Sequence, residues 1–361
     1  MKAVAVLAVL PEYRRGFVEA LLHEFEGSSD ELTLVVGDAH SDPTVLSGEF
    51  ESVIRVKNWH LMGRRLIWQW GALRLARKAD VVVVDLNPRS LTAWALIVAT
   101  RLRRQRVLVW GHISPRAGAG ASTAPLRRAM RRAAHGVISY TWSDAARVQA
   151  EDPNIPTWVA ANGLYPAAEM GWDASRHRNR ILYVGRLEPA KKPALAIEAF
   201  AIALPNLPGD VRLTFVGSGS LEAALERQVA ELGVRHRVEF LGHISELRAL
   251  RKIYDETLIS VSPGYVGLSL TQSLGFGVAM LVADGEPHAP EVELLTEATG
   301  SFFPADDPLA LAEAFRQATE RAKCWDPAHL VYSVKSTYSA EAMADGFIYA
   351  LRNQPASRGH Q

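Results

Sequence analysis

The chain has 361 residues, a formal net charge of +1 and a hydrophobic fraction of 48%. These values are typical of a soluble globular protein, and the length suffices for two domains of ordinary size, each with its own core. The single cysteine, Cys324, excludes a disulfide framework and a cysteine-based zinc site, and it fits a reducing compartment.

The first half alternates apolar, β-branched runs with longer helical patterns. Its start, Met1–Leu10, is too short for a membrane span and carries no cleavage-site pattern, so we expect a buried strand and not a signal peptide. Strands are predicted at Ala3–Leu10, Leu32–Val36, Val81–Asp85, Val107–Trp110, Gly136–Ser139 and Thr157–Ala160. Helices are predicted at Gly16–Phe25 and Leu91–Arg103.

A second series of the same kind fills the other half. Its strands are predicted at Ile181–Val184, Arg212–Val216, Val238–Leu241, Leu258–Val261 and Ala279–Val282, and its helices at Ala194–Ala203, Leu221–Leu232 and Leu268–Phe276. This alternation indicates parallel, doubly wound sheets of the α/β class. The polar stretch Ala167–Arg180 is the expected linker, so the domains are predicted at 1–168 and 178–340. An amphipathic helix at Ala340–Arg352 and a frayed tail at Asn353–Gln361 follow.

Residues 51–150 carry a marked excess of Lys and Arg over Asp and Glu, although the whole chain is nearly neutral. Trp59, Trp68 and Trp70 lie among these arginines, and four more arginines occur within Ala124–Ala134. Such a mixture suits the interface of an anionic membrane, which is the interpretation we prefer. A polyanionic acceptor and a solvated face are the alternatives. No recognised nucleic-acid module occurs, so no nucleic-acid partner is expected.

Two cations follow the strand predicted at Ile181–Val184. Arg186 and Lys191 come after Gly185, at the carboxyl end of the strand, where open α/β sheets bind their ligands. A planar guanidinium and a mobile ammonium suit phosphate oxygens, and both can neutralise a departing diphosphate. The spacing alone is equally compatible with solvated surface cations.

Two glycine turns follow later strands. Gly217 and Gly219 permit close approach of the backbone and free the N–H groups of a helix for an anion, though a plain tight turn uses the same residues. Gly264 and Gly267 frame the start of the helix at Leu268–Phe276, whose first N–H groups suit a phosphate or a sugar hydroxyl. We favour a ligand site because three such segments end successive strands.

In order and spacing, these segments resemble the donor domain of the GT-B fold glycosyltransferases, specifically the retaining family-4 group. The resemblance is close over residues 181–293 and loose over the first half. Its motifs are Val184–Leu187 with Lys191, Phe215–Gly219, Phe240–Gly242, Gly264–Leu268, Leu274–Gly277 and, before the linker, Asn162–Gly163. It implies two Rossmann-like domains that face a central cleft, with residues 341–361 beginning as a helix that crosses back to the first domain.

The resemblance also implies a role for each matching residue. Arg186 and Lys191 would grip the donor diphosphate as catalytic cations, and His112 would lie near the reacting sugar, although a lone histidine is more often structural. The expected donor-binding residues are Gly185, Gly217, Gly219, His243, Ile244, Gly264, Tyr265, Val266, Gly267, Leu268 and Gln272. The expected acceptor-binding residues are Tyr13, Arg14 and Gly16, which replace the usual glycine pair after the first strand.

One departure from the family pattern concerns the contacts to the donor's sugar and ribose. The family usually has two glutamates, where this chain has Gly264 and Gln272. Either the donor lacks a hydroxyl that these glutamates normally contact, or the site has lost catalysis, or the loop at Glu286–Glu291 supplies the contacts. We favour the loop, because Glu286 and His288 follow a strand at the same sheet edge. A polar turn shaped by two prolines is the alternative for that loop.

The sequence thus predicts a retaining glycosyltransferase that moves a sugar from a nucleotide-diphosphate donor to an acceptor hydroxyl, for example of a lipid-linked or other anionic glycan precursor. No cofactor and no metal ion are expected, because Arg186 and Lys191 would take over the metal's role. The expected partners are a nucleotide sugar, a glycan, lipid-linked or small-molecule acceptor, and an anionic membrane surface. The expected location is cytoplasmic or at the inner face of the membrane. A catalytically silent sugar-nucleotide-binding subunit, a GT-B-fold epimerase and a phosphorylase are the alternatives.

Overall fold

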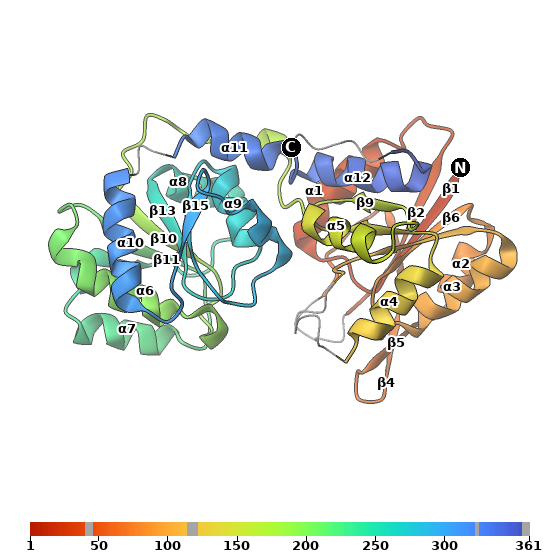
Figure 1. Ribbon diagram of the computed structural model, residues 1–361, viewed down its shortest axis with the longest axis horizontal. Helices are drawn as coiled ribbons and strands as arrows, with labels where there is room; N and C mark the ends of the chain where they lie inside the picture. Colours follow the sequence, from red (N-terminus) through yellow and green to blue (C-terminus); the bar gives the residue numbers. More distant parts are fainter. Residues whose placement is uncertain (40–45, 114–121, 322–324, 356–361) are drawn as a thin grey trace. The chain divides into compact units, whose positions relative to one another are not determined.

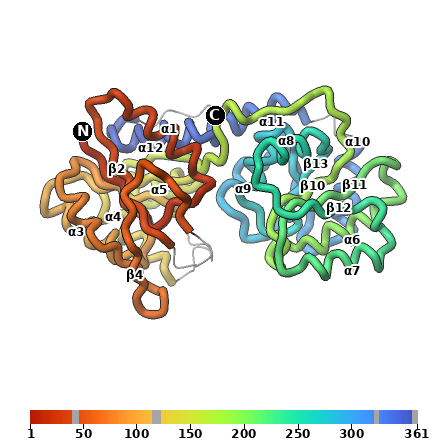
Figure 2. The backbone as a smooth tube through the Cα atoms, turned by 180° about the vertical axis from the view of Figure 1, so that it is seen from behind, coloured from red at the N-terminus to blue at the C-terminus, as the bar shows by residue number. Residues whose placement is uncertain are grey.

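The chain forms two compact α/β units (Figures 1 and 2). The computed structural model describes residues 1–39, 46–113, 122–321 and 325–355. Unit 1 comprises Met1–Ala167 and Thr337–Gln361, and unit 2 comprises Ala168–Ser336. Unit 2 therefore begins within the polar stretch that the sequence marked as a linker, and the last helix of the chain groups with unit 1. Cys324 and residues 356–361 of the expected tail lie outside the described residues.

The sheet of unit 1 has the strand order β3-β2-β1-β6-β7-β8-β9, and its neighbouring strands are parallel. The strands are β1 (Lys2–Leu7), β2 (Glu31–Gly37), β3 (Val53–Val56), β6 (Val81–Asp85), β7 (Arg106–Trp110), β8 (Gly136–Ser139) and β9 (Thr157–Val159). Because the order reverses between β1 and β6, the loops after these two strands border the switch point at which open sheets bind ligands.

Helices cover both faces of this sheet. On one face, α1 (Arg15–His23) and α12 (Ala340–Arg352) pack together, and both bury apolar side chains against the strands. Figure 1 shows these two helices side by side although they come from opposite ends of the chain. The core of the other face is completed by α2 (Ala72–Leu75), α3 (Leu91–Arg103), α4 (Ala124–Ala133) and α5 (Trp142–Glu151). Coverage on both faces explains the uninterrupted apolar run of β6.

An antiparallel hairpin that the sequence patterns did not predict projects from unit 1 (Figure 1). It consists of β4 (Asn58–Leu61) and β5 (Leu66–Gln69). Two buried amides anchor its base: Asn58 Nδ2 donates to the carbonyl oxygens of Ala8 and Ala39, both at 2.7 Å, and Gln69 Nε2 donates to the Leu7 carbonyl at 2.8 Å. The hairpin is thus tied to the carboxyl end of β1 by polar residues, which a search for apolar strands overlooks.

Unit 2 contains a sheet with the order β12-β11-β10-β13-β14-β15, again with parallel neighbours. Its strands are β10 (Arg180–Val184), β11 (Arg212–Val216), β12 (Val238–Phe240), β13 (Thr257–Ser262), β14 (Met280–Ala283) and β15 (Gly300–Phe303). Its helices are α6 (Pro193–Ala203), α7 (Glu222–Glu231), α8 (Leu247–Asp255), α9 (Leu268–Gly275), α10 (Pro308–Arg321) and α11 (Pro327–Lys335). The strand order reverses between β10 and β13.

Both units therefore confirm the predicted α/β class with doubly wound parallel sheets. Besides the hairpin, the patterns did not predict the strands β3 and β15 or the helices α2, α4, α5, α8, α10 and α11. Among the described residues, no helix combines the length and the apolar character that crossing a bilayer requires.

Candidate nucleotide-sugar site

The two segments with the strongest sequence signal meet at the switch point of unit 2. The loop after β10 carries Arg186 and Lys191, and the glycine turn follows β13, the adjacent strand. Lys191 Nζ donates to the carbonyl oxygen of Tyr265 at 2.7 Å and stands 4.3 Å from the centroid of its ring. The Tyr265 N–H in turn donates to the Ala190 carbonyl at 3.2 Å. One cation and the turn thus form a single unit at the position where such sheets bind ligands.

Arg186 is held by its backbone while its side chain stays exposed. The Tyr183 hydroxyl donates to the Arg186 carbonyl oxygen at 2.9 Å, and the guanidinium forms no ion pair within the described residues. Glu188 lies close by, but its carboxylate accepts hydrogen bonds from the N–H and the hydroxyl of Ser220. These two hydrogen bonds lower the pKa of Glu188 more than the charge of Arg186 does. The guanidinium is therefore available for an anion from solvent.

The glycines after β10 and β11 allow two loops to run in direct backbone contact. A Cβ atom on Gly217 would collide with the carbonyl oxygen of Gly185, and one on Gly219 would collide with that of Leu187. Gly217 also has a φ of +144°, a conformation that side chains disfavour. The Leu187 N–H donates to the Ser218 carbonyl at 2.9 Å. These glycines therefore shape the base of the loop that carries the cations.

The start of α9 lacks a side-chain cap. Gly267 stands at the N-cap position without such a hydrogen bond, and Leu268 is the first helical residue. The early N–H groups of a helix need partners from outside it, so this end can accept an anion or a hydroxyl. Gln272 is buried deeper in the same helix, where its Oε1 accepts a hydrogen bond from the Tyr254 hydroxyl at 3.1 Å. That bond ties α9 to α8.

Glu286 and His288 both contact other residues of this chain. Glu286 Oε1 lies 2.5 Å from Lys192 Nζ, which also binds Asp306 Oδ1 at 2.6 Å. His288 Nδ1 accepts from the Val266 N–H at 3.1 Å, and Nε2 lies 2.7 Å from the Ala283 carbonyl oxygen. Nδ1 is thus an acceptor and Nε2 the donor, so the ring is neutral. The pKa of His288 is lowered, mainly because the ring is partly buried.

His288 thus pins the glycine turn to the end of β14. The remaining predicted donor residues, His243 and Ile244, follow β12, with His243 exposed and Ile244 half-buried. Their loop joins the others because the Gly217 N–H donates to the Gly242 carbonyl at 2.8 Å. Loops after β10, β11, β12 and β13 are therefore linked along one sheet edge.

In unit 1 the predicted acceptor residues follow β1. Tyr13 is 44% exposed and Arg14 only 5%. Gly16, the second residue of α1, lies against Pro166 and Ala340, and a Cβ atom there would lie 3.1 Å from that of Ala340, so its small size serves packing. His112 follows β7, and its ring centroid lies 4.7 Å from that of Tyr140. Dense surroundings lower the pKa of His112, with desolvation as the main cause, although solvent still reaches the residue.

Two polar residues at this edge were missed by the sequence patterns. Asp85 ends β6 at the switch point and accepts a hydrogen bond from the Ala8 N–H at the end of β1. Burial raises the pKa of Asp85 to about 7. Arg127, on α4, donates from Nη1 to the Leu86 carbonyl at 2.6 Å and the His112 carbonyl at 2.8 Å. An acidic residue that ends an apolar strand is a detectable signal, but nothing local distinguishes Arg127 from the other arginines of α4.

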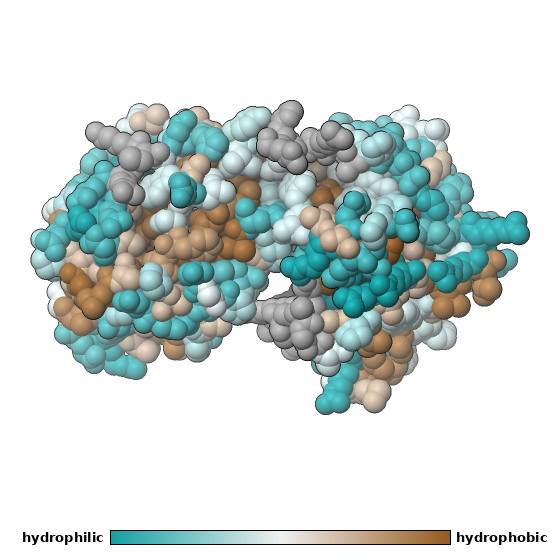
Figure 3. Space-filling view, in the orientation of Figure 1, coloured by the Kyte–Doolittle hydropathy of each residue, from teal (hydrophilic) through white to brown (hydrophobic). Residues whose placement is uncertain are grey.

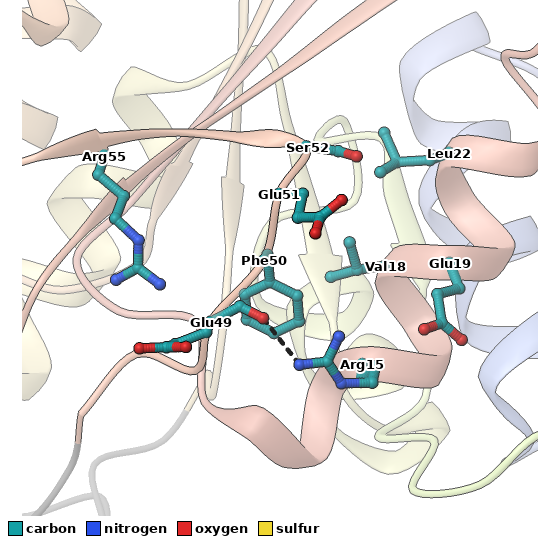
Figure 4. A pocket seen from close by; sticks show the side chains of 9 residues that line it. All are labelled: Arg15, Val18, Glu19, Leu22, Glu49, Phe50, Glu51, Ser52 and Arg55. Atoms are coloured by element: carbon teal, nitrogen blue, oxygen red, sulfur yellow. Dashed lines mark hydrogen bonds between the residues drawn. The ribbon is translucent and has the colours of Figure 1, made fainter.

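A cavity of about 590 Å³ lies on unit 1 between α1 and the segment that leads into β3 (Figure 4). Arg15 Nη2 donates to the Glu49 carbonyl at 2.7 Å across it, and the Arg15 guanidinium stands 5.1 Å from the Phe50 ring. None of the residues predicted to bind donor or acceptor lines this cavity. It is therefore separate from the sites at the carboxyl ends of the strands.

A comparison with protein families finds a match within unit 2. Residues 172–324 match the family model described as glycosyl transferases group 1. A Campylobacter jejuni α-1,4-N-acetyl-D-galactosaminyltransferase that acts on GalNAc-α-(1→4)-GalNAc-α-(1→3)-diNAcBac-PP-undecaprenol is 27% identical over 187 residues, which cover 49% of this chain and 50% of that protein. A D-inositol 3-phosphate glycosyltransferase of Mycolicibacterium paratuberculosis is 31% identical over 166 residues, which cover 43% of this chain and 36% of the relative. The chain thus spans half or less of the length of these relatives.

Solved structures match over nearly the whole chain at low identity. Anabaena HepE in complex with UDP has a TM-score of 0.69 and 16% identity, and covers 98% of this chain and 100% of its own. The lipopolysaccharide outer core galactosyltransferase WaaB has a TM-score of 0.71 and 11% identity, and the match covers 98% of this chain and 99% of WaaB. At such identities the likeness shows the fold alone. The chain therefore has a fold of the GT-B type, and its match to the glycosyl transferases group 1 model covers residues 172–324.

Proposed function

We propose that this protein is a glycosyltransferase that transfers a sugar from a nucleotide-diphosphate donor to an acceptor hydroxyl. The observation that carries the proposal is the contact of Lys191 with Tyr265 at the switch point of unit 2, beside the exposed Arg186. The two cations and the uncapped start of α9 at Gly267 present positive charge and N–H donors from adjacent strands. This combination suits a diphosphate and its sugar.

The chemistry proposed for this site is electrostatic. The bond from the anomeric carbon to the diphosphate oxygen breaks, the acceptor oxygen bonds to the same face of that carbon, and the acceptor proton passes to the departing diphosphate. Configuration is thereby retained. Arg186 and Lys191 stabilise the charge that grows on the diphosphate, so the reaction as proposed needs no metal ion and no cofactor. A rate unchanged by EDTA after extensive dialysis is the expected outcome.

The names of the relatives support an anionic acceptor. One acts on a glycan linked through pyrophosphate to undecaprenol, and another on D-inositol 3-phosphate. We extend to this chain the class that these acceptors share, a hydroxyl compound that carries phosphate, whether free or lipid-linked.

We propose that the β4–β5 hairpin brings unit 1 to an anionic membrane surface. Trp59, Met62 and Trp70 are 56%, 72% and 73% exposed, and Arg65 is exposed at the turn. Figure 3 shows hydrophobic side chains gathered on this projecting part beside hydrophilic ones. Exposed tryptophans next to cations suit the headgroup region of a bilayer. The arginines of α4 support this proposal less, because Arg131 and Arg132 pair with Glu151 and Asp152.

A panel of UDP, GDP and dTDP sugars tests the donor proposal. The expected result is that one nucleotide raises the melting temperature of the wild type, and that the matching sugar donor is slowly hydrolysed with release of the nucleoside diphosphate. Arg186→Ala should melt at the wild-type temperature, because its side chain is exposed, yet release nucleotide at least a hundredfold more slowly. Binding without release from any donor and any acceptor would favour a catalytically silent subunit, and conversion to an epimeric sugar nucleotide would favour an epimerase.

A further inference from the structure

We propose that Arg14 and Arg127 form a phosphate-binding site at the carboxyl edge of the unit 1 sheet, and that this site holds the phosphate group of the acceptor. The inference rests on the proposed function, because it assigns acceptor chemistry to the same reaction. It is carried by the two guanidinium groups, which form no ion pair among the described residues, although the Asp144 carboxylate attracts Arg127 electrostatically.

Arg14 is a buried cation surrounded by aromatic rings. Its Cζ lies 5.4 Å from the ring centroids of Tyr13 and Trp110 and 5.0 Å from that of Tyr140, and its Nη1 lies 2.8 Å from the sulfur of Met343. Ring faces attract a cation, but a buried charge in a protein normally has a counter-charge as well. No described carboxylate pairs with Arg14, so the site is complete only with an anion.

Among the described arginines of α4, Arg127 is the one whose side chain binds the loops at the sheet edge. Its Nη1 is fixed by the carbonyl oxygens of Leu86 and His112, which follow β6 and β7. Its Nε is buried and has no hydrogen-bond partner. Arg128 and Arg131, by contrast, both lie against Glu151, at 3.4 Å and 2.6 Å. Arg127 thus forms no ion pair among the described residues, although Asp144 opposes the burial and the Arg89 charge that lower the pKa of its guanidinium.

Both arginines are linked to His112, one directly and one through Tyr140. Arg127 binds its carbonyl, and Tyr140 contacts both the His112 ring and the Arg14 guanidinium. His112 is exposed, yet desolvation by the surrounding atoms is the main cause that lowers the pKa of its ring; Asp144 opposes this shift, and both arginines add to it. The Asp144 carboxylate is itself engaged, since it accepts from the Ile113 N–H at 3.3 Å and lies 3.8 Å from Arg147.

Phosphate fits this arrangement better than a neutral group. A guanidinium presents a planar fork of donors that matches phosphate oxygens, and two such forks around a neutral imidazole can share a dianion. A sugar hydroxyl would leave both guanidinium groups without an ion-pair partner. The position also suits an acceptor, because the loops after β1 and β6 border the switch point of unit 1 and the loop after β7 follows the next strand of the sheet.

Calorimetric titration with inorganic phosphate, at constant ionic strength, tests the site in the full-length protein. We compare wild type with Arg14→Met, which keeps the apolar contacts with the rings, and with Arg127→Gln. Arg128→Gln is the matched control on the same helix, and Arg186→Ala removes a cation of the donor site. Phosphate affinity should fall at least tenfold in Arg14→Met and Arg127→Gln and stay within twofold in the other two.

Equal affinity in all five proteins, no measurable phosphate binding by the wild type, or loss only in Arg186→Ala would overturn the proposal. If Arg14→Met fails to fold, Arg127→Gln still decides, because that residue is only partly buried. Titration with UDP, GDP and dTDP separates the two proposals. Phosphate binding that depends on Arg127, in a protein that binds no nucleotide, would support this site while it refutes the donor site. Acetate and glucose serve as further probes: equal affinity for either would contradict phosphate recognition.

Discussion

Gly264 and Ala190 lie so close that no side chain fits at residue 264. A Cβ atom there would stand 2.6 Å from the Ala190 carbonyl oxygen, the same atom that accepts the N–H of Tyr265. The loop that carries Lys191 therefore occupies the space that a glutamate would need. The departure from the family-4 pattern at this position is built into the backbone of the site.

Gly264→Ala should therefore displace the Lys191 loop and lower stability by about 1–3 kcal/mol, the usual cost of forcing extra atoms into a packed position. Donor affinity should fall as well, because Tyr265 would lose its contact with the ammonium. Thermal melting with and without donor measures both effects. Gly209→Ala is the control, since nothing lies within 4 Å of a Cβ atom there. Equal stability of the two variants would contradict the steric account.

Neighbouring lysines should respond differently to the same substitution. Lys191→Met removes the cation that touches the glycine turn, so we expect at least tenfold weaker donor binding and a transfer rate lowered by roughly 10²–10³-fold. Lys192→Met removes the cation held by Glu286 and Asp306, so it should lower the melting temperature and leave donor affinity within twofold. Calorimetry with the nucleotide and melting curves distinguish the two, and reversed behaviour would refute the assignment.

Asp85 should make stability depend on pH. Its pKa is raised from 3.8 to about 7 in the folded protein, so between these values the folded state binds more protons than the unfolded state. The stabilising effect of protonation is full below pH 4 and is lost as the pH rises to about 7. Asp85→Asn keeps an oxygen for the Ala8 N–H but carries no charge. The variant should therefore melt at a higher temperature than the wild type at pH 8, and this difference in melting temperature should be smaller at pH 5. A difference that is constant across this range would contradict the raised pKa.

The hairpin should control binding to anionic vesicles. The double variant Trp59→Ser/Trp70→Ser removes two exposed rings from a membrane interface, so partitioning onto phosphatidylglycerol vesicles should fall about tenfold or more. Leu102→Ser, at a side chain that is 82% exposed on α3, is the control for loss of an exposed apolar group. Sedimentation with vesicles measures both. Equal losses in the two variants, or wild-type protein that stays in the supernatant, would exclude the hairpin as the contact.

Most of the sheet architecture could be predicted because its signals are local. The uninterrupted apolar run at Val81–Val84 indicates a strand covered on both faces, and Leu91–Arg103 and Ala340–Arg352 have the predicted bounds. The β4–β5 hairpin could not be predicted, because the residues that anchor it, Asn58 and Gln69, are buried polar groups whose partners at the end of β1 lie 50 and 62 residues away.

The sequence by itself determined the alternation of strands and helices, and with it the position of Arg186, Lys191 and the turn at Gly264 at strand ends, because these patterns depend only on neighbours along the chain. The tertiary structure alone decided what each polar group contacts. Glu286 contacts Lys192, and His288 contacts the backbone of the glycine turn and the end of β14, whereas their predicted contact with a donor stays a prediction. The fold likewise leaves Arg127 without the carboxylate that its neighbours on α4 share. Such pairings depend on contacts between distant segments, and no local pattern encodes them.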